Sequence, residues 1–156
     1  MIRSIRILLL ASGLTAAAGL ASAQAFDAET AYKLRESHMK LMGAHLGVLG
    51  KMAKGEAEYD AEVAAASATT LAGLASGAHG NYWVEGSSSD EIADSRALPA
   101  IWEKREDFDA NTEALIQATS AMRDAAGTDL AALQGAMGGL GGACGDCHKA
   151  YRKPEE

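Results

Sequence analysis

The sequence predicts an all-α fold, an antiparallel four-helix bundle, on three observations. Apolar residues recur at steps of three and four in four segments, which is the spacing of one helix face. No segment shows the strict apolar–polar alternation of a half-buried strand. Two connections between the segments are short and one is long, and four antiparallel helices can be joined in this way.

The first two segments are expected to form a helical pair. The first carries two neighbouring apolar stripes from Tyr32 onward, so its helix should have a broad buried face and stop near Gly55. The second starts at Asp60, whose carboxylate suits an N-cap. Gly77 and Gly80 end it.

The long connection covers residues 81–95 and is rich in Gly, Ser and Asp, with Tyr82 and Trp83 as anchors. The third segment opens with Pro99, a residue favoured in a first helical turn, and ends at Gly127. We expect one continuous helix between these two residues.

The fourth segment starts after Thr128, a candidate N-cap, and runs to Tyr151 with Cys144 and Cys147 on its apolar stripe. Glycines inside it each cost about 0.5–1 kcal/mol relative to alanine, although they can also let a flat ligand approach the backbone. These glycines are Gly135, Gly138, Gly139, Gly141, Gly142 and Gly145.

Residues 1–23 have the composition of a secretory signal peptide. A start with two arginines is followed by an apolar stretch over 7–20 and by small residues at 21–23 that suit a signal peptidase. We expect a mature chain beginning at Gln24, with 24–156 as one soluble domain outside the cytoplasm. The alternative is an uncleaved N-terminal anchor.

Charge and cysteine content exclude some classes of protein. The formal net charge is −7, and without the signal peptide 12 basic residues face 21 acidic ones, a net charge of −9. This acidic balance argues against a nucleic-acid-binding protein and favours partners with basic patches. With two cysteines, the chain lacks the many bridges of a disulfide-rich domain. A disulfide between cysteines three residues apart would close a small loop and constrain little of the unfolded chain, so their role should be chemical.

The run Cys144-Gly145-Asp146-Cys147-His148 has the sequence of a haem c attachment site. On a helix, both cysteines and the histidine share one face, so two thioethers can form to one porphyrin while the imidazole reaches the iron. Three alternatives exist for this motif: a thioredoxin-type dithiol, a zinc site that needs a fourth ligand, and an incidental disulfide. The dithiol motif normally opens a helix in a βαβ unit, whereas this one closes an all-α chain.

With this motif in place, the chain resembles the class II c-type cytochromes, the cytochrome c′ family and its low-spin relatives, from end to end. The shared features are the C-terminal position of Cys-x-x-Cys-His followed by Tyr151-Arg152, the Arg35-x-x-x-Met39 segment, the segment Leu98-Pro99-Ala100-Ile101-Trp102 to Phe108, and Tyr82-Trp83. The resemblance implies a bundle with one covalent haem c between the helices and His148 as proximal iron ligand. It also implies a homodimer through the first two helices.

The resemblance places Met39 over the distal face of the iron. Low-spin members use a methionine there as sixth ligand, which favours ferrous iron, and look like electron carriers. We therefore predict one-electron transfer to periplasmic redox partners through a His148/Met39 haem, and no enzymatic activity. The alternative is a five-coordinate haem that binds NO or CO. His38 and His45 are less favoured as ligands, and His79 less still.

Two arginines complete the predicted site. Arg35 lies one helical turn before Met39 and, by resemblance, should pair with a haem propionate; a surface ion pair is the alternative. Arg152 matches a family position flanking the proximal haem face. Lys149 and Lys153 are expected to be solvated.

Overall fold

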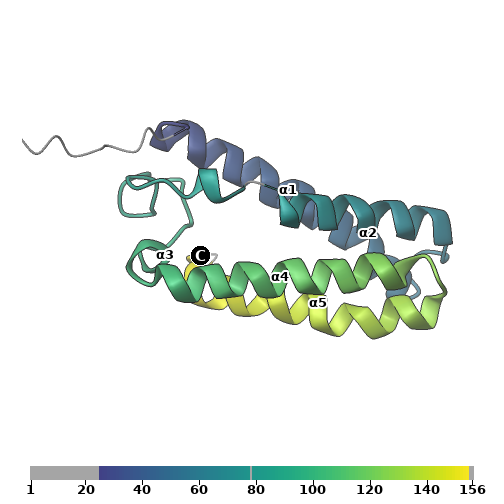
Figure 1. Ribbon diagram of the computed structural model, residues 1–156. Helices are drawn as coiled ribbons and strands as arrows, with labels where there is room; N and C mark the ends of the chain where they lie inside the picture. Colours follow the sequence, from purple (N-terminus) through teal and green to yellow (C-terminus); the bar gives the residue numbers. More distant parts are fainter. Residues whose placement is uncertain (1–24, 78, 155–156) are drawn as a thin grey trace, which may run out of the picture.

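A computed structural model describes residues 25–77 and 79–154. The predicted signal peptide therefore lies outside the described residues. The elements are α1 (Ala28–Ala53), α2 (Ala61–Ser76), the short 3-10 helix η1 (His79–Tyr82), α3 (Ala100–Glu103), α4 (Arg105–Ala126) and α5 (Leu130–Tyr151). Four long helices run antiparallel, which confirms the predicted all-α bundle (Figure 1).

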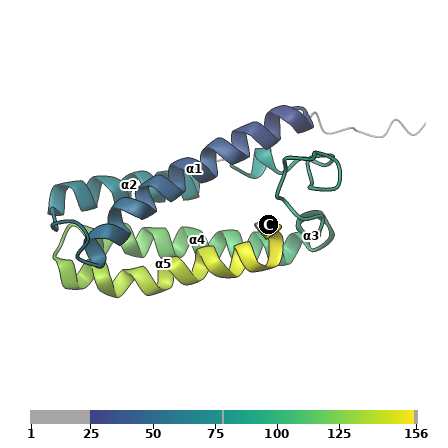
Figure 2. The same ribbon diagram turned by 180° about the vertical axis from the view of Figure 1, so that it is seen from behind.

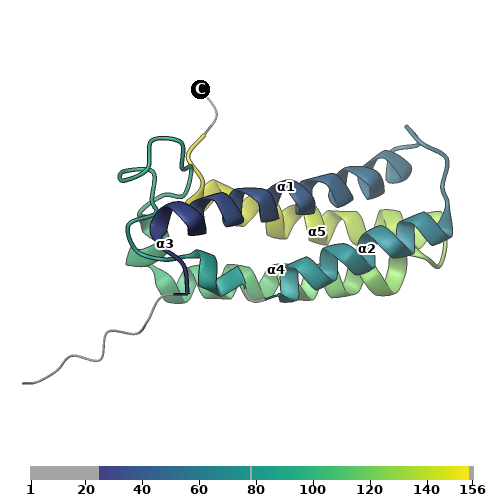
Figure 3. The ribbon, with the colours of Figure 1, turned by 90° about the horizontal axis from the view of Figure 1, so that it is seen from above.

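The helices form two pairs that separate toward one end. α4 packs along α5 and against α2, and α2 packs against α1, whereas α1 meets α5 over a shorter stretch. Seen from behind, α1 rises away from α4 and α5 toward its N-terminal end (Figure 2). The 83–99 connection, α3 and the C-terminal tail lie at that same end (Figure 3).

Three aspartates fix where three of the four long helices, α1, α2 and α5, begin. The carboxylates of Asp27, Asp60 and Asp129 accept backbone N–H groups two or three residues later, at 2.8 to 3.0 Å. The N-cap at Asp60 is confirmed. The predicted N-cap at Thr128 is wrong by one residue, because Asp129 has the extended backbone and the accepting side chain.

The third predicted helix is interrupted at Lys104. Its φ of −123° and ψ of 51° lie outside the helical region, so the segment divides into α3 and α4. No glycine or proline occurs at this break, and the apolar spacing continues through it. Periodicity alone could not locate it.

The core has two parts. The larger part, here called the bundle core, fills the end where all four long helices meet, with Leu49, Leu71, Met122, Leu133 and Leu140 at most 2% exposed. The smaller part, here called the end cluster, lies at the separated end and consists of Ala97, Ile101, Phe108 and Tyr151.

Within the described residues, no helix is long and apolar enough to cross a membrane.

The six glycines of α5 face open space. A Cβ added at any of them would meet nothing within 4 Å. Gly127 is different, because its Cβ would come 2.9 Å from the Cβ of Ala65, where α2 closely approaches the end of α4.

Gly135→Ala should raise the free energy of unfolding by about 0.5–1 kcal/mol, because alanine reduces the backbone freedom of the unfolded chain and its Cβ meets no clash in the helix. Gly127→Ala, the matched control, should lower it by about 1–3 kcal/mol through overpacking against Ala65. Denaturant unfolding of both variants measures the two effects. A loss of stability in Gly135→Ala would contradict this account of α5.

Candidate functional site

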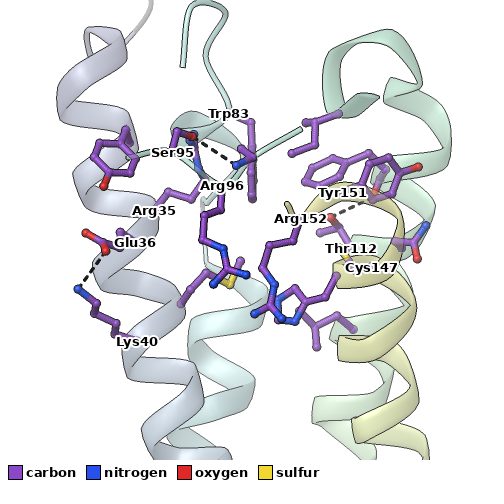
Figure 4. A pocket seen from close by; sticks show the side chains of 18 of the residues that line it. Arg35, Glu36, Lys40, Trp83, Ser95, Arg96, Thr112, Cys147, Tyr151 and Arg152 are labelled. Atoms are coloured by element: carbon purple, nitrogen blue, oxygen red, sulfur yellow. Dashed lines mark hydrogen bonds and ion pairs between the residues drawn. The ribbon is translucent and has the colours of Figure 1, made fainter. Parts of the chain in front are cut away.

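A cavity of about 350 Å³ opens where α1 separates from α4 and α5. α1 and α5 form facing walls, and the loop after η1 closes the end between them (Figure 4). Five of the six predicted site residues line it: Arg35, Met39, Cys147, His148 and Arg152. The sequence thus identified side chains from two distant helices that meet in one site.

The two cysteines lie on α5 but meet different neighbours. Cys147 packs against the end cluster and lines the cavity, whereas Cys144, one turn earlier, packs against the bundle core. Burial raises the pKa of both thiols, and the charge of Cys144 raises that of Cys147 further. Before a haem is attached, both side chains would therefore be protonated thiols at neutral pH.

His148 is partly buried in the α5 wall. Burial lowers the pKa of its imidazole, and the charges of Arg152 and Arg96 lower it further. The neutral imidazole that results is the form that binds a metal ion.

Met39 reaches the same cavity from the α1 wall and also packs against the bundle core. Neither His38 nor His45 lines the cavity. The His38 ring packs edge-on against Tyr82 at 6.0 Å, and the Nδ1 atom of His45 is buried with no hydrogen-bond partner. His38 and His45, which the sequence offered as alternative iron ligands, therefore lie outside the cavity wall.

Arg35 is almost fully buried, with 6% of its surface exposed. Its guanidinium donates to oxygens of Tyr82, Ser87 and Ser95, so the alternative of a surface ion pair is wrong. Desolvation lowers the pKa of this guanidinium to about 10, which leaves it protonated at neutral pH.

Arg96 was not predicted as a site residue, yet it lines the cavity. The backbone around it pairs with the C-terminal tail: Lys153 N–H donates to Arg96 O at 2.8 Å, and the Arg96 guanidinium donates to Lys153 O. Arg96 and Arg152 both reach into the cavity (Figure 4). No sequence motif marks Arg96, because only this tertiary pairing brings residue 96 beside the end of α5.

Three aromatic rings support the closed end of the cavity. Trp83 packs edge-to-face on Phe108 at 4.7 Å, and Phe108 packs edge-to-face on Tyr151 at 5.3 Å. Trp102 donates its indole N–H to the backbone oxygen of Trp83 at 3.2 Å, outside the cavity. This cluster gives the cavity a rigid apolar wall.

The side chains present fit a haem c. An apolar wall suits a porphyrin ring, while Arg35, Lys40, Arg96 and Arg152 give the lining a basic excess over Glu36 and Asp94. That excess suits the two carboxylates of a haem, in a protein whose net charge is otherwise acidic. Within the described residues, no group of three or more His, Cys, Asp or Glu side chains is placed to hold a metal ion, so the zinc alternative gains no fourth ligand.

The family model described as Cytochrome C′ matches residues 30–152. The chain belongs to the cytochrome c′ family. Cytochrome c-554 of Cereibacter sphaeroides is 50% identical over 121 residues, which cover 78% of this chain and 79% of that relative. As a member of this family, the chain carries one covalently attached haem c with its iron.

Solved structures of cytochromes c′ share this fold. A cytochrome c′ from Rhodobacter sphaeroides has a TM-score of 0.81 and 34% identity, covering 83% of this chain and all of that one (100%). A nitric oxide complex of a variant of cytochrome c prime from Alcaligenes xylosoxidans has a TM-score of 0.73 and 31% identity, covering 82% and 98%. Proteins of this family are electron carriers or gas-binding haem proteins rather than typical enzymes.

Phe108→Ala should lower the free energy of unfolding by about 3–5 kcal/mol and also alter the Soret circular dichroism, because Phe108 supports Trp83 in the cavity wall. Leu133→Ala is the matched control. It should cost about 2–5 kcal/mol in the bundle core and leave the haem spectrum unchanged. An unaltered haem spectrum in Phe108→Ala would show that this wall does not contact the cofactor.

Proposed function

We propose that this cytochrome c′ family member carries single electrons in the periplasm, with its haem attached through Cys144 and Cys147 and its iron held by His148 and Met39. The observation that supports this is that Met39 on α1 and His148 on α5 line one cavity. When bound, the haem supplies an iron that alternates between the ferrous and ferric states.

The residues of the chain would hold and tune that iron. His148 presents a neutral imidazole from α5. Met39 presents a thioether from α1, and a thioether ligand favours the ferrous state and so raises the reduction potential. The apolar wall of Trp83, Ile101 and Phe108 limits water in the site, which also affects the potential.

The second candidate function is the binding of NO or CO to a five-coordinate haem. In that case Met39 would line the distal pocket without coordinating, and a small gas would reach the iron beside it. The nitric oxide complexes of cytochrome c prime from Alcaligenes xylosoxidans, at 31% identity, favour this candidate more directly than they favour the first. The first candidate depends instead on the side chain that this chain places in the α1 wall.

Met39→Ala decides between the two candidates. If Met39 coordinates, the native protein should show narrow low-spin absorption bands and slow CO uptake. The variant should become high-spin and bind CO at least about tenfold faster, because the Met39 thioether no longer competes with CO for the iron. Absorption spectra of both oxidation states, with and without CO, provide the measurement.

Met42→Ala serves as the control, because Met42 lies one turn further along α1, is buried in the bundle core and does not line the cavity. Its spectrum should match that of the native protein. A high-spin spectrum in the native protein would rule out Met39 coordination and leave gas binding as the function.

We also propose that the signal peptide over 1–23 directs export.

We further propose that the mature domain over 24–156 forms a homodimer through α1 and α2. Leu41 on α1 and Val63 on α2 support this contact, because they are large apolar side chains with 53% and 45% of their surface exposed. Leu41→Glu should convert a dimer to a monomer in light scattering of the holoprotein. A native protein that is monomeric at all concentrations would exclude this interface.

A further inference from the structure

The Arg35 guanidinium is enclosed by oxygens of the loop that closes the cavity. Nη1 donates to Tyr82 O at 2.8 Å and to Ser87 Oγ at 3.0 Å. Nη2 donates to Ser87 O at 2.8 Å and to Ser95 Oγ at 3.2 Å. A guanidinium has five N–H donors, four of them on these two nitrogens, so the last residue of η1 and the loop after it together occupy all four.

Only the Nε–H group of Arg35 is left for another acceptor. A two-pronged grip on a carboxylate needs two N–H groups in a fork, and the loop would have to release at least one of its bonds to provide them. A bidentate clamp, which is the strongest form that pairing with a haem propionate could take, therefore does not fit Arg35 in this arrangement. The charge of Arg35 still acts on the cavity, but its hydrogen bonds are directed to the loop.

The loop connects Arg35 to the far wall of the cavity. The Ser95 hydroxyl donates to Ser87 O at 2.9 Å and accepts the Ala97 N–H at 3.3 Å. One residue after Ala97, Leu98 N–H donates to Tyr151 O at 3.0 Å, and Ala97 itself pairs with Arg152 as an isolated β-bridge. Hydrogen bonds made by the 95–98 backbone and side chains thus link α1 to Tyr151 and Arg152, about one helical turn after His148 at the end of α5.

Arg35 also holds an aromatic part of the wall. Its guanidinium carbon lies 4.8 Å from the centre of the Trp83 ring, whose neighbouring ring, Phe108, lies 4.7 Å away. Both rings line the cavity. Loss of the loop bonds to Arg35 would therefore free the Trp83 ring and the α5 end together.

We propose that Arg35 is a positioning residue that locks the 82–97 loop onto α1, and that this lock, rather than a carboxylate clamp, fixes the shape of the haem cavity. The part concerning the cavity rests on the proposed haem site. The part concerning the loop stands on the described contacts alone.

Hydrogen–deuterium exchange of the holoprotein tests the lock. Arg35→Lys keeps the charge but cannot make four forked bonds. Ser95→Ala leaves the arginine and removes one acceptor. Both variants should speed amide exchange in 83–98, roughly tenfold or more for Arg35→Lys, since bonds to a charged group are lost. The double variant should exchange no faster than the faster single variant, because both changes break one network.

Matched controls separate this effect from nonspecific loosening. Arg123→Lys makes the same substitution at an exposed site on α4, and Ser89→Ala removes a hydroxyl of the same loop that does not accept from Arg35. Both should exchange like the native protein. If Arg35→Lys proves unstable, Ser95→Ala alone carries the test.

Soret circular dichroism of the same holoproteins reads the cavity itself. The lock predicts altered spectra in both Arg35→Lys and Ser95→Ala. A carboxylate clamp predicts an altered spectrum in Arg35→Lys only, with native loop exchange, and that result would overturn the proposal. Faster amide exchange in the loop together with native Soret spectra in both variants would overturn the part of the proposal that concerns the shape of the cavity. The axial ligation of the native protein is read separately from its absorption bands, so failure of the His148/Met39 assignment is recognised independently.

Discussion

A cavity between two helices must be held open against the tendency of apolar side chains to fill space, and this constraint shapes the structure. Protein interiors pack densely, so helices that separate need support from something other than their own contacts. Here the bundle core closes one end, with Leu133 and Leu140 of α5 fully buried. At the other end α1 is joined to the rest of the protein by the loop that Arg35 binds.

The same end combines burial with positive charge. Arg35 is a desolvated cation with no acidic partner within 4 Å among the described residues, and burying a charge costs stability unless it is well hydrogen-bonded. The loop offsets this cost with neutral oxygens and the Trp83 ring, while an anionic cofactor in the cavity would offset it further. The positive charges of Arg96 and Arg152 also help to keep His148 neutral, so the electrostatics that suit the carboxylates of a haem also suit the proposed iron ligand.

The sequence predicted the features that depend on spacing within one segment. Helical periodicity located the four long helices, and the run from Cys144 to His148 identified the cofactor before any contact was known. Tertiary arrangements were less accessible. The break at Lys104 leaves the apolar pattern intact, and the role of Arg96 depends on pairing between a loop and the C-terminal tail.

Arg35 illustrates the difference most clearly. Its position one turn before Met39 correctly placed it at the cavity, because residues four apart on a helix share a face. Its partners could not be predicted, since Ser87 and Ser95 lie more than 50 residues away in a loop without periodicity. The identity of a buried arginine indicates that partners must exist, but only the fold determines which oxygens they are.

The two sides of the cavity differ in how strongly the family constrains them. In the proposed site the proximal side comes from one short run on α5, so the attachment motif would bring its ligand with it. The distal side comes from α1, which reaches the site only through tertiary packing, and there one side chain separates two functions. A Met39 thioether that binds the iron would favour an electron carrier. A thioether that does not bind would leave the iron five-coordinate, so that NO or CO could bind in the same fold. Membership of the cytochrome c′ family therefore fixes the cofactor, while in the proposed site the distance from Met39 to the iron would decide the chemistry.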